Sequence, residues 1–452
     1  MEKTVRRAGY LERLHESQGA TGVVKVITGM RRCGKSTLME QFIDDLRSEG
    51  VDDSHIFHVN FETFEGYDLI SSDVLRRKLR ELPKDGIVYI LLDEIQDVKG
   101  WELIVSSLEE VKNYDVYITG SNSDMLSTDL STHLSGRYLE IGMLPLSFKE
   151  YLELHPGNIE ERFDQYLRYG GLPDADPDRG ERHCMGYLEG VFSTVLIKDV
   201  LSRLKTDDVN KIRSIARFLY SNIGNITNIA GIAKGTGLNA TTVSRYIAGM
   251  ESAMLFYHAE KYDIAGKKLL STNGKFYASD LGMRYMALKG SGTDDMSRAL
   301  ENAVFLELLR RDYTVRVGSY RDREIDFTAI KGSEVEYYQV ALTMLSDGTR
   351  EREFRSLESV RDNFPKTVLT ADRFNLGTYN GIKVVNVTDW MLGESKRRSR
   401  SRGPSVLSEL FPQQLFELAC FAAGSVAGFP AGAGPHPGTG VLLREHRAQL
   451  VI

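Results

Sequence analysis

The chain has 452 residues, of which 42% are hydrophobic and 27% are charged, and its formal net charge at pH 7 is −6. This length predicts two or three domains, and the composition is that of a globular protein in water. The mildly acidic net charge argues neither for nor against nucleic-acid binding, and any such contact would have to use a local basic patch.

The cysteines and the termini favour a cytoplasmic protein. Cys33, Cys184 and Cys420 show neither metal-ligand spacing nor a disulfide framework, which indicates free thiols in a reducing compartment. The N-terminus lacks the apolar core of a signal peptide, and the most apolar tract, Leu415–Gly434, is interrupted by Glu417 and Pro430. We therefore expect no membrane contact.

Short apolar runs alternate with helical spacing between residues 23 and 141. The runs are Val23–Thr28, Ile56–Phe61, Ile87–Leu92 and Val116–Thr119, and helical spacing occupies Ser36–Glu49 and Ser72–Arg80. Near-continuous apolar runs are typical of parallel strands that helices cover on both faces. The pattern predicts a doubly wound α/β domain.

A phosphate-binding signature follows the first strand. Residues 29–36 read Gly-Met-Arg-Arg-Cys-Gly-Lys-Ser, which fits G-x-x-x-x-G-K-[ST] in full. Backbone N–H groups of such a loop wrap phosphates at a helix N-terminus. Lys35 is expected to neutralise the β- and γ-phosphates of ATP, and Ser36 to complete a Mg²⁺ shell. The predicted nucleotide contacts are Gly29, Arg31, Arg32, Cys33, Gly34, Lys35, Ser36 and Thr37.

The strand Ile87–Leu92 ends in Asp93 and Glu94. The carboxyl ends of parallel strands form the ligand-binding edge of an α/β sheet, so both carboxylates are expected there. Asp93 is expected to hold the Mg²⁺ ion and its water shell, and Glu94 to orient or deprotonate the attacking water. Acids also cap helices, so this pair of carboxylates indicates a nucleotide site only in combination with the upstream phosphate loop.

Polar residues follow the next strand as well. Ser121 and Asn122 come after Val116–Thr119, and a polar side chain there can hold the lytic water or sense the γ-phosphate. We expect Ser121 and Asn122 jointly in this role rather than Thr119, although a plain turn explains the same residues.

An arginine, Arg137, lies on a tight turn before the short strand Tyr138–Ile141. Near the site, it would stabilise charge on the transferring phosphoryl group. A surface ion pair is the equal alternative.

The combination of these motifs resembles a large prokaryotic family of AAA-type ATPases. The motifs are Gly-Met-Arg-Arg-x-Gly-Lys-Ser-Thr, Leu-Leu-Asp-Glu-Ile-Gln, Ile-Thr-Gly-Ser-Asn-Ser, Leu-Ser-Gly-Arg and Leu-Pro-Leu-Ser-Phe-Lys-Glu-Tyr. The resemblance spans about residues 9–393, with Tyr166–Pro173 as the junction after the ATPase core. It implies ATPase activity and Arg137 as the arginine finger; if Arg137 acts in trans, the active form is a homo-oligomer.

Residues 225–252 read as a helix-turn-helix, and strands around Leu255–Tyr262 and Lys267–Phe276 are expected to form a wing. Its exposed faces offer residue types that contact phosphates or base edges: Asn239, Thr241, Thr242, Ser244 and Arg245. Double-stranded DNA is a candidate partner. Packing or protein contact is the alternative, because the second helix carries a single arginine.

Residues 300–341 resemble the core of the PD-(D/E)xK nuclease-like fold. Glu301 lies on a predicted helix and Asp326 on a predicted strand, but Gln339 replaces the second acid and Ala341 replaces the lysine. Since a working site needs these groups to hold Mg²⁺ and polarise water, we expect the fold without cleavage.

The predicted layout has five parts. They are an AAA-type ATPase domain (1–145), a helical connector (146–205), a winged-helix domain (206–290), a PD-(D/E)xK-like α/β domain (291–393) and a disordered tail (394–452). The predicted function is an ATP-hydrolysing switch that moves the C-terminal modules. A nucleic-acid-binding regulator that uses ATP as a ligand switch is the alternative.

Overall fold

The computed structural model describes residues 4–122, 125, 134, 136–204, 208–270, 274–290 and 296–393. These residues fall within the first of the two units into which the chain divides, Met1–Arg397. The tail expected to be disordered, 394–452, lies outside the described residues. Among the helices of the described segments, none is both long and apolar enough to cross a membrane.

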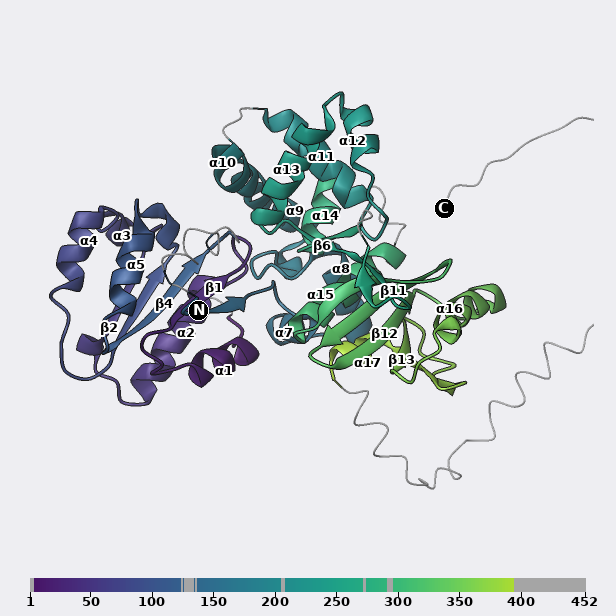
Figure 1. Cartoon of the computed structure of the whole chain (residues 1–452), viewed down its shortest axis with the longest axis horizontal. Coiled ribbons are helices and arrows are strands. Elements are labelled where there is room, and N and C mark those ends of the chain that lie inside the picture. The colour runs from purple at the N-terminus through teal and green to yellow at the C-terminus, as the bar shows by residue number, and fades with distance from the viewer. Residues whose placement is uncertain are drawn as a thin grey trace, which may run out of the picture. The chain divides into compact units, whose positions relative to one another are not determined.

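The N-terminal part of the chain forms a parallel five-stranded sheet in the order β2-β3-β4-β1-β5 (Figure 1). Its strands are Val24–Thr28 (β1), Ile56–Asn60 (β2), Val88–Asp93 (β3), Tyr114–Gly120 (β4) and Tyr138–Gly142 (β5). The strands β1, β3 and β4 are buried along their whole length, as the apolar runs predict for strands covered on both faces. The predicted α/β architecture is confirmed.

Helices cover both faces of this sheet. The main ones are α1 (Ala8–Glu16), α2 (Lys35–Ser48), α4 (Ser72–Leu79) and α5 (Trp101–Glu109), and a short helix α3 (Phe64–Tyr67) follows β2. Along β3, Tyr89 and Leu91 belong to the core that contains α1 and α2, whereas Ile90 and Leu92 belong to the core that contains α4 and α5. All five strands run parallel, so the residues that follow them meet at one edge.

A helical region follows the sheet. It comprises α7 (Phe148–Leu154), α8 (Ile159–Tyr169), α9 (Glu181–Thr194), the π-helical stretch η5 (Val195–Leu201) and α10 (Ser202–Leu204). The Gly-Gly turn after α8 is tied to the start of α14 (Leu281–Ala287) by Asp280, whose carboxylate accepts hydrogen bonds from the peptide N–H groups of Gly171 at 2.7 Å and Met283 at 3.1 Å. Two buried peptide groups are thereby satisfied.

The predicted winged-helix domain begins with α11 (Val209–Ser221), and its expected helix-turn-helix, residues 225–252, contains α12 (Ile229–Thr236) and α13 (Ala240–Ser252). Asn228 and Asn239 cap α12 and α13 by accepting hydrogen bonds from peptide N–H groups of their first turns. Gly237, in the left-handed region with a φ of 68°, ends α12.

The strands after α13 differ from the expected wing. Each predicted strand is divided: β6 (Phe256–Ala259) pairs with β9 (Lys275–Ala278), whereas β7 (Lys261–Asp263) and β8 (Lys268–Leu269) pair with each other. The reason is that β7 also pairs, in parallel, with β10 far along the chain.

The C-terminal part forms an eight-stranded mixed sheet in the order β14-β15-β13-β12-β11-β10-β7-β8. Its further elements are α15 (Met296–Arg310), β10 (Thr314–Tyr320), β11 (Arg323–Lys331), β12 (Glu334–Ala341), α16 (Asp347–Ser359), β13 (Lys366–Thr370), β14 (Gly377–Tyr379), β15 (Ile382–Asn386) and α17 (Val387–Met391). The strands β10, β11 and β12 are antiparallel, and β13 runs parallel to β12. The nuclease-like identification of this region stays a prediction.

Candidate functional site

The predicted phosphate loop connects β1 to α2 at the carboxyl edge of the parallel sheet. Its path depends on glycine: a Cβ on Gly29 would lie 2.5 Å from the carbonyl oxygen of Met143, and Gly34 has a φ of 104°. Arg32 also lies in the left-handed region, with a φ of 68°. The loop thereby curls over the N-terminus of α2, where backbone N–H groups are available to an anion.

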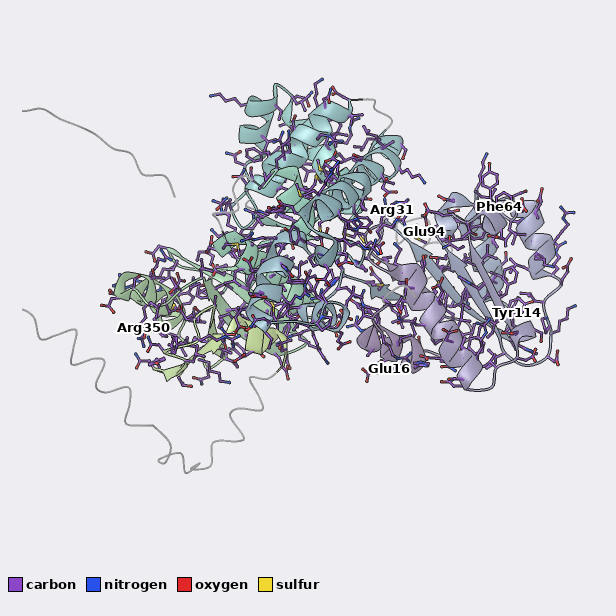
Figure 2. The ribbon with its side chains drawn as sticks, turned by 180° about the vertical axis from the view of Figure 1, so that it is seen from behind. Glu16, Arg31, Phe64, Glu94, Tyr114 and Arg350 are labelled. Carbon is purple, nitrogen blue, oxygen red and sulfur yellow. The ribbon has the colours of Figure 1, made fainter. Side chains whose placement is uncertain are left out.

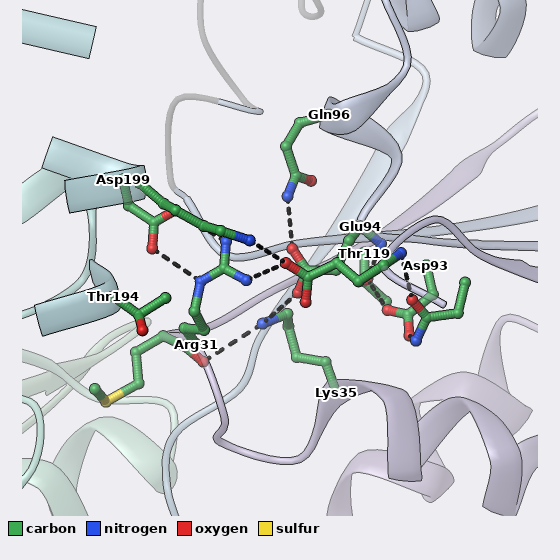
Figure 3. Close-up of polar contacts among 12 residues, drawn as sticks. Arg31, Lys35, Asp93, Glu94, Gln96, Thr119, Thr194 and Asp199 are labelled. Carbon is green, nitrogen blue, oxygen red and sulfur yellow. Dashed lines mark hydrogen bonds and ion pairs between the residues drawn. The ribbon is translucent and has the colours of Figure 1, made fainter. Parts of the chain in front are cut away.

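Lys35 lies buried at the mouth of this loop. Its Nζ donates to the carbonyl oxygens of Gly29 at 3.1 Å and Met30 at 3.4 Å, and it lies 3.1 Å from Oε1 of Glu94 (Figure 3). Burial opposes the charged lysine, but Glu94, Cys33 and Asp93 together raise the pKa of Lys35. The ammonium group therefore stays charged where a polyphosphate needs it.

Asp93 ends β3 and lies beside the start of α2. One of its carboxylate oxygens accepts a hydrogen bond from the Thr119 hydroxyl, and the other accepts one from Nδ2 of Asn60 at 2.8 Å. Burial raises the pKa of Asp93, while hydrogen bonds with the side chains of Ser36 and Thr119 oppose the shift. A hydroxyl and a carboxylate thus lie together, and oxygen donors of this kind are those that Mg²⁺ prefers.

Glu94 follows with a left-handed backbone, at a φ of 55°. Its peptide N–H donates to Oγ1 of Thr119 at 2.9 Å, and its Oε2 accepts from Nε2 of Gln96 at 2.6 Å. Burial alone would raise the pKa of Glu94, but Lys35, Gln96 and Arg31 together lower it. The carboxylate is therefore ionised at neutral pH, as a proton acceptor must be.

The polar residues at the end of β4 have separate contacts. Thr119 is the one that bonds with both Asp93 and Glu94. Ser121 and Asn122 are each only 1% exposed, and Oδ1 of Asn122 accepts a hydrogen bond from Oγ of Ser252 at 2.8 Å. The geometry therefore assigns the contact with the acids to Thr119, and it connects Asn122 with the end of α13.

Arg137 lies at the other edge of the sheet. The register pairs Tyr138 with Val24 and Gly142 with Thr28, so Arg137 precedes β5 at the amino edge of β1, opposite the phosphate loop. Figure 2 shows how far apart the two edges are, with Glu94 at one end of the sheet and Tyr114, which begins β4, at the other. The structure does not bring Arg137 near the phosphate loop of its own chain, because a parallel strand starts where its neighbour starts.

The guanidinium of Arg137 is 53% exposed and lies 3.1 Å from Oε1 of the buried Glu109. The pair thus joins an exposed guanidinium to a buried carboxylate, and a carboxylate that is buried without its partner is unfavourable.

Arg31 connects the phosphate loop with the helical region (Figure 3). Its Nε and Nη2 donate to the two carboxylate oxygens of Asp199 in η5, each at 3.1 Å. Its Nη1 donates to Glu62, and Nζ of Lys198 lies 3.5 Å from the same carboxylate. Sequence reasoning predicted Arg31 as a nucleotide contact and missed Asp199, for which no motif exists. The available signal was a Lys-Asp pair within an apolar helical stretch.

A cavity of about 740 Å³ lies beside the loop. Its lining comes from the phosphate loop, the chain after β2, and α9 with η5: Arg31, Arg32, Phe61, Glu62, Tyr67, Ile70, Asp97, Gly186, Tyr187, Gly190, Val191, Thr194 and Lys198. The volume is in the range of small-molecule sites, roughly 300–1,000 Å³. Its charged lining consists of three cations and two acids, Glu62 and Asp97.

A second polar cluster surrounds a lysine that sequence reasoning did not identify. Nζ of Lys275, from β9, lies 3.2 Å from Oε1 of Glu301 and 2.8 Å from Oε1 of Glu324. Burial and the negative charge of Glu301 raise the pKa of Asp326 well above its ordinary value. Lys275 therefore connects β9 with α15 and β11 through its two ion pairs.

Both polar atoms of the Gln339 side chain, beside this cluster, form hydrogen bonds. Its Oε1 accepts from the peptide N–H of Asp326 at 2.7 Å, and its Nε2 donates to Oε2 of Glu353 at 2.7 Å. The Gln339 amide therefore joins β12 to β11 and to α16.

Two family models match the chain. A model described as "AAA domain" matches residues 22–152, and a model described as a domain of unknown function matches residues 160–294. The phosphate loop, Asp93, Glu94 and Arg137 all fall within the first.

Full-length relatives also match. An uncharacterized protein of Haemophilus influenzae is 37% identical over 405 residues, which cover 86% of this chain and 98% of the relative. An uncharacterized protein of Methanocaldococcus jannaschii is 30% identical over 397 residues, which cover 81% and 85%. Among solved structures, the Aeropyrum pernix ORC1 protein in complex with DNA is 14% identical, with 66% of this chain and 95% of that chain covered and a TM-score of 0.26.

Proposed function

This chain belongs to the AAA-domain family that includes its Haemophilus influenzae relative, and we propose that it binds ATP and hydrolyses it to ADP and phosphate. One observation carries the proposal: a single buried cluster contains Lys35, 3.1 Å from Glu94, and Asp93, which the Thr119 hydroxyl holds beside Glu94 next to the start of α2. A cation for the phosphates, oxygen donors for a metal and an ionised acid for water are the groups that this reaction needs.

Each group has a role in this proposal. The loop N–H groups and Lys35 bind the β- and γ-phosphates. Ser36 and Asp93 would hold Mg²⁺, which when bound supplies positive charge to the phosphates. The phosphates compete with Glu94 for Lys35, so nucleotide binding releases the Glu94 carboxylate to orient the attacking water and accept its proton. Thr119 keeps the two acids in place.

Lys35→Ala tests the proposal. We expect ATP to bind about tenfold to a hundredfold more weakly, because a charge-assisted contact of roughly 1.5–3 kcal/mol is lost. Calorimetric titration with ATP and Mg²⁺ measures the affinity, and phosphate release measures turnover. Lys112→Ala, an exposed lysine before β4, is the matched control. Wild-type affinity in a folded Lys35→Ala protein contradicts the proposal, and Lys35→Met serves if the alanine variant unfolds.

We further propose that the nucleotide state reaches the helical region through Arg31 and Asp199. Arg31 belongs to the phosphate loop, and Asp199 belongs to η5. A phosphate that attracts Arg31 weakens its two hydrogen bonds with Asp199, and a ligand shifts a conformational equilibrium by such differential contacts. The hydrogen bond between Asn122 and Ser252 is a second connection, from β4 to α13.

Asp199→Asn is expected to separate hydrolysis from this response. The amide cannot form an ion pair with Arg31, so the change that ATP causes in hydrogen exchange over residues 181–201 should disappear while ATP still binds. Hydrogen–deuterium exchange with and without a non-hydrolysable ATP analogue measures the response. Asp164→Asn, which removes a surface pair with Arg168, is the control. An undiminished response in Asp199→Asn rules out this route.

Nucleic-acid binding is a second candidate function. We propose that α11, α12 and α13 with β6 and β9 form a winged-helix module, and α13 exposes Thr241, Ser244 and Arg245 on one face. The turnover assay repeated with double-stranded DNA tests this role. Stimulation that Arg245→Ala abolishes supports it, and turnover that DNA leaves unchanged argues against it.

A further inference from the structure

A separate group of metal-ligating side chains lies where the helical region begins. His155 follows α7, and Asp176 and Asp178 belong to the turn η4 (Pro177–Arg179) and its cap. One ligand atom from each lies within 4.8 Å of the others. Nδ1 of His155 is 3.5 Å from Oδ1 of Asp176 and 3.6 Å from Oδ2 of Asp178. Neighbouring ligands of a tetrahedral ion with bonds of about 2.1 Å lie ~3.4 Å apart.

The histidine points into this group from a buried position. Its side chain is 3% exposed, and the ring of Tyr151 packs against it with centroids 4.8 Å apart. Its Nδ1 has no hydrogen-bond partner within the described part of the chain. A buried nitrogen without a partner costs about 1–3 kcal/mol, and a cation that takes its lone pair removes that cost.

Each aspartate also pairs with an arginine, through the carboxylate oxygen that does not face His155. Nη1 of Arg162 donates to Oδ1 of Asp178 at 2.8 Å, and Nε of Arg179 lies 3.4 Å from Oδ2 of Asp176. Oδ1 of Asp176 also accepts from the peptide N–H of Asp178 at 2.9 Å. In metal sites, outer partners of this kind orient the ligating carboxylates. The oxygens that face His155 keep lone pairs for an ion.

We propose that His155, Asp176 and Asp178 form a site for a divalent transition-metal ion such as Zn²⁺. One imidazole nitrogen and two carboxylate oxygens suit such an ion, with a fourth position for water. The two arginines offset part of the carboxylate charge, so the affinity is moderate. The ion joins the end of α7 to the turn before α9, and the helix that α9 begins continues to Asp199. A metal at this place therefore stiffens the helical region between α7 and α9.

Zinc titration of the full chain tests the site. We expect one Zn²⁺ per chelator-treated chain by calorimetry, with a higher melting temperature, and at least tenfold weaker binding in His155→Ala and in Asp178→Asn. His183→Ala, on α9 outside the group, is the control. Asp178→Asn changes a residue with 40% side-chain exposure, so it remains informative if the buried His155→Ala variant unfolds. Absence of stoichiometric Zn²⁺ in the wild-type chain, or wild-type affinity in Asp178→Asn, overturns the proposal.

Discussion

Glu94→Gln is expected to lower ATP turnover by about 10²–10⁴-fold while the chain still binds ATP. The amide cannot accept a proton from water. It also cannot pair as a charge with Lys35, whose Nζ lies 3.1 Å from Glu94. Since the phosphates then have no acidic competitor for the ammonium, we expect ATP affinity to equal or exceed that of the wild-type chain.

Steady-state phosphate release and calorimetric ATP binding measure the two effects on the same preparation. Glu110→Gln, an exposed acid at the end of α5, is the control. Turnover within about threefold of wild type would remove Glu94 from the proton-accepting role, because the expected loss is at least tenfold larger. If Glu94→Gln loses both ATP binding and its folded structure, the role of Glu94 is to stabilise the buried cluster and not to accept a proton.

Arg137→Ala is expected to lower turnover by about 10³–10⁵-fold, the range for an arginine that stabilises a transferring phosphoryl group. ATP affinity should change little, because Arg137 lies at the amino edge of β1 and the phosphate loop lies at the carboxyl edge. The arginine must then come from a second chain. Its guanidinium is 53% exposed, and to act there it would have to exchange Glu109, 3.1 Å away, for the phosphate of the second chain.

A mixture of two inactive variants tests the action in trans. Lys35→Ala keeps the arginine, and Arg137→Ala keeps the phosphate loop, so mixed assemblies should recover part of the activity. Arg76→Ala, exposed on α4, is the control for loss of a surface arginine. A mixture that stays inactive, although pull-down of a tagged chain shows that the variants assemble together, excludes the mechanism.

The phosphate loop and the acid pair could be predicted because their parts are neighbours in the sequence. Residues 29–36 must form one loop between a strand and a helix, and Asp93 and Glu94 must leave the same strand. Local steric rules and the burial pattern of parallel strands are enough to place such groups at one edge of a sheet.

The contacts of Thr119 and Arg137 could not be predicted in the same way. Thr119 bonds with the acids because β4 lies beside β3, and Arg137 lies away from the loop because β5 runs parallel to β1. The neighbours of a strand depend on how the whole chain returns to the sheet, and the sequence of the strand carries little information about this.

The sequence by itself determined that this chain has a parallel α/β sheet with a loop for phosphates, since periodicity and spacing report local backbone geometry. Only the tertiary structure decided that Arg31 meets Asp199, 168 residues away, that Lys275 joins Glu301, and that His155 faces two aspartates. Each of these contacts joins segments that local rules treat independently. Whether these contacts form depends on burial and packing across the whole fold, and these are set by the complete sequence and not by any one segment.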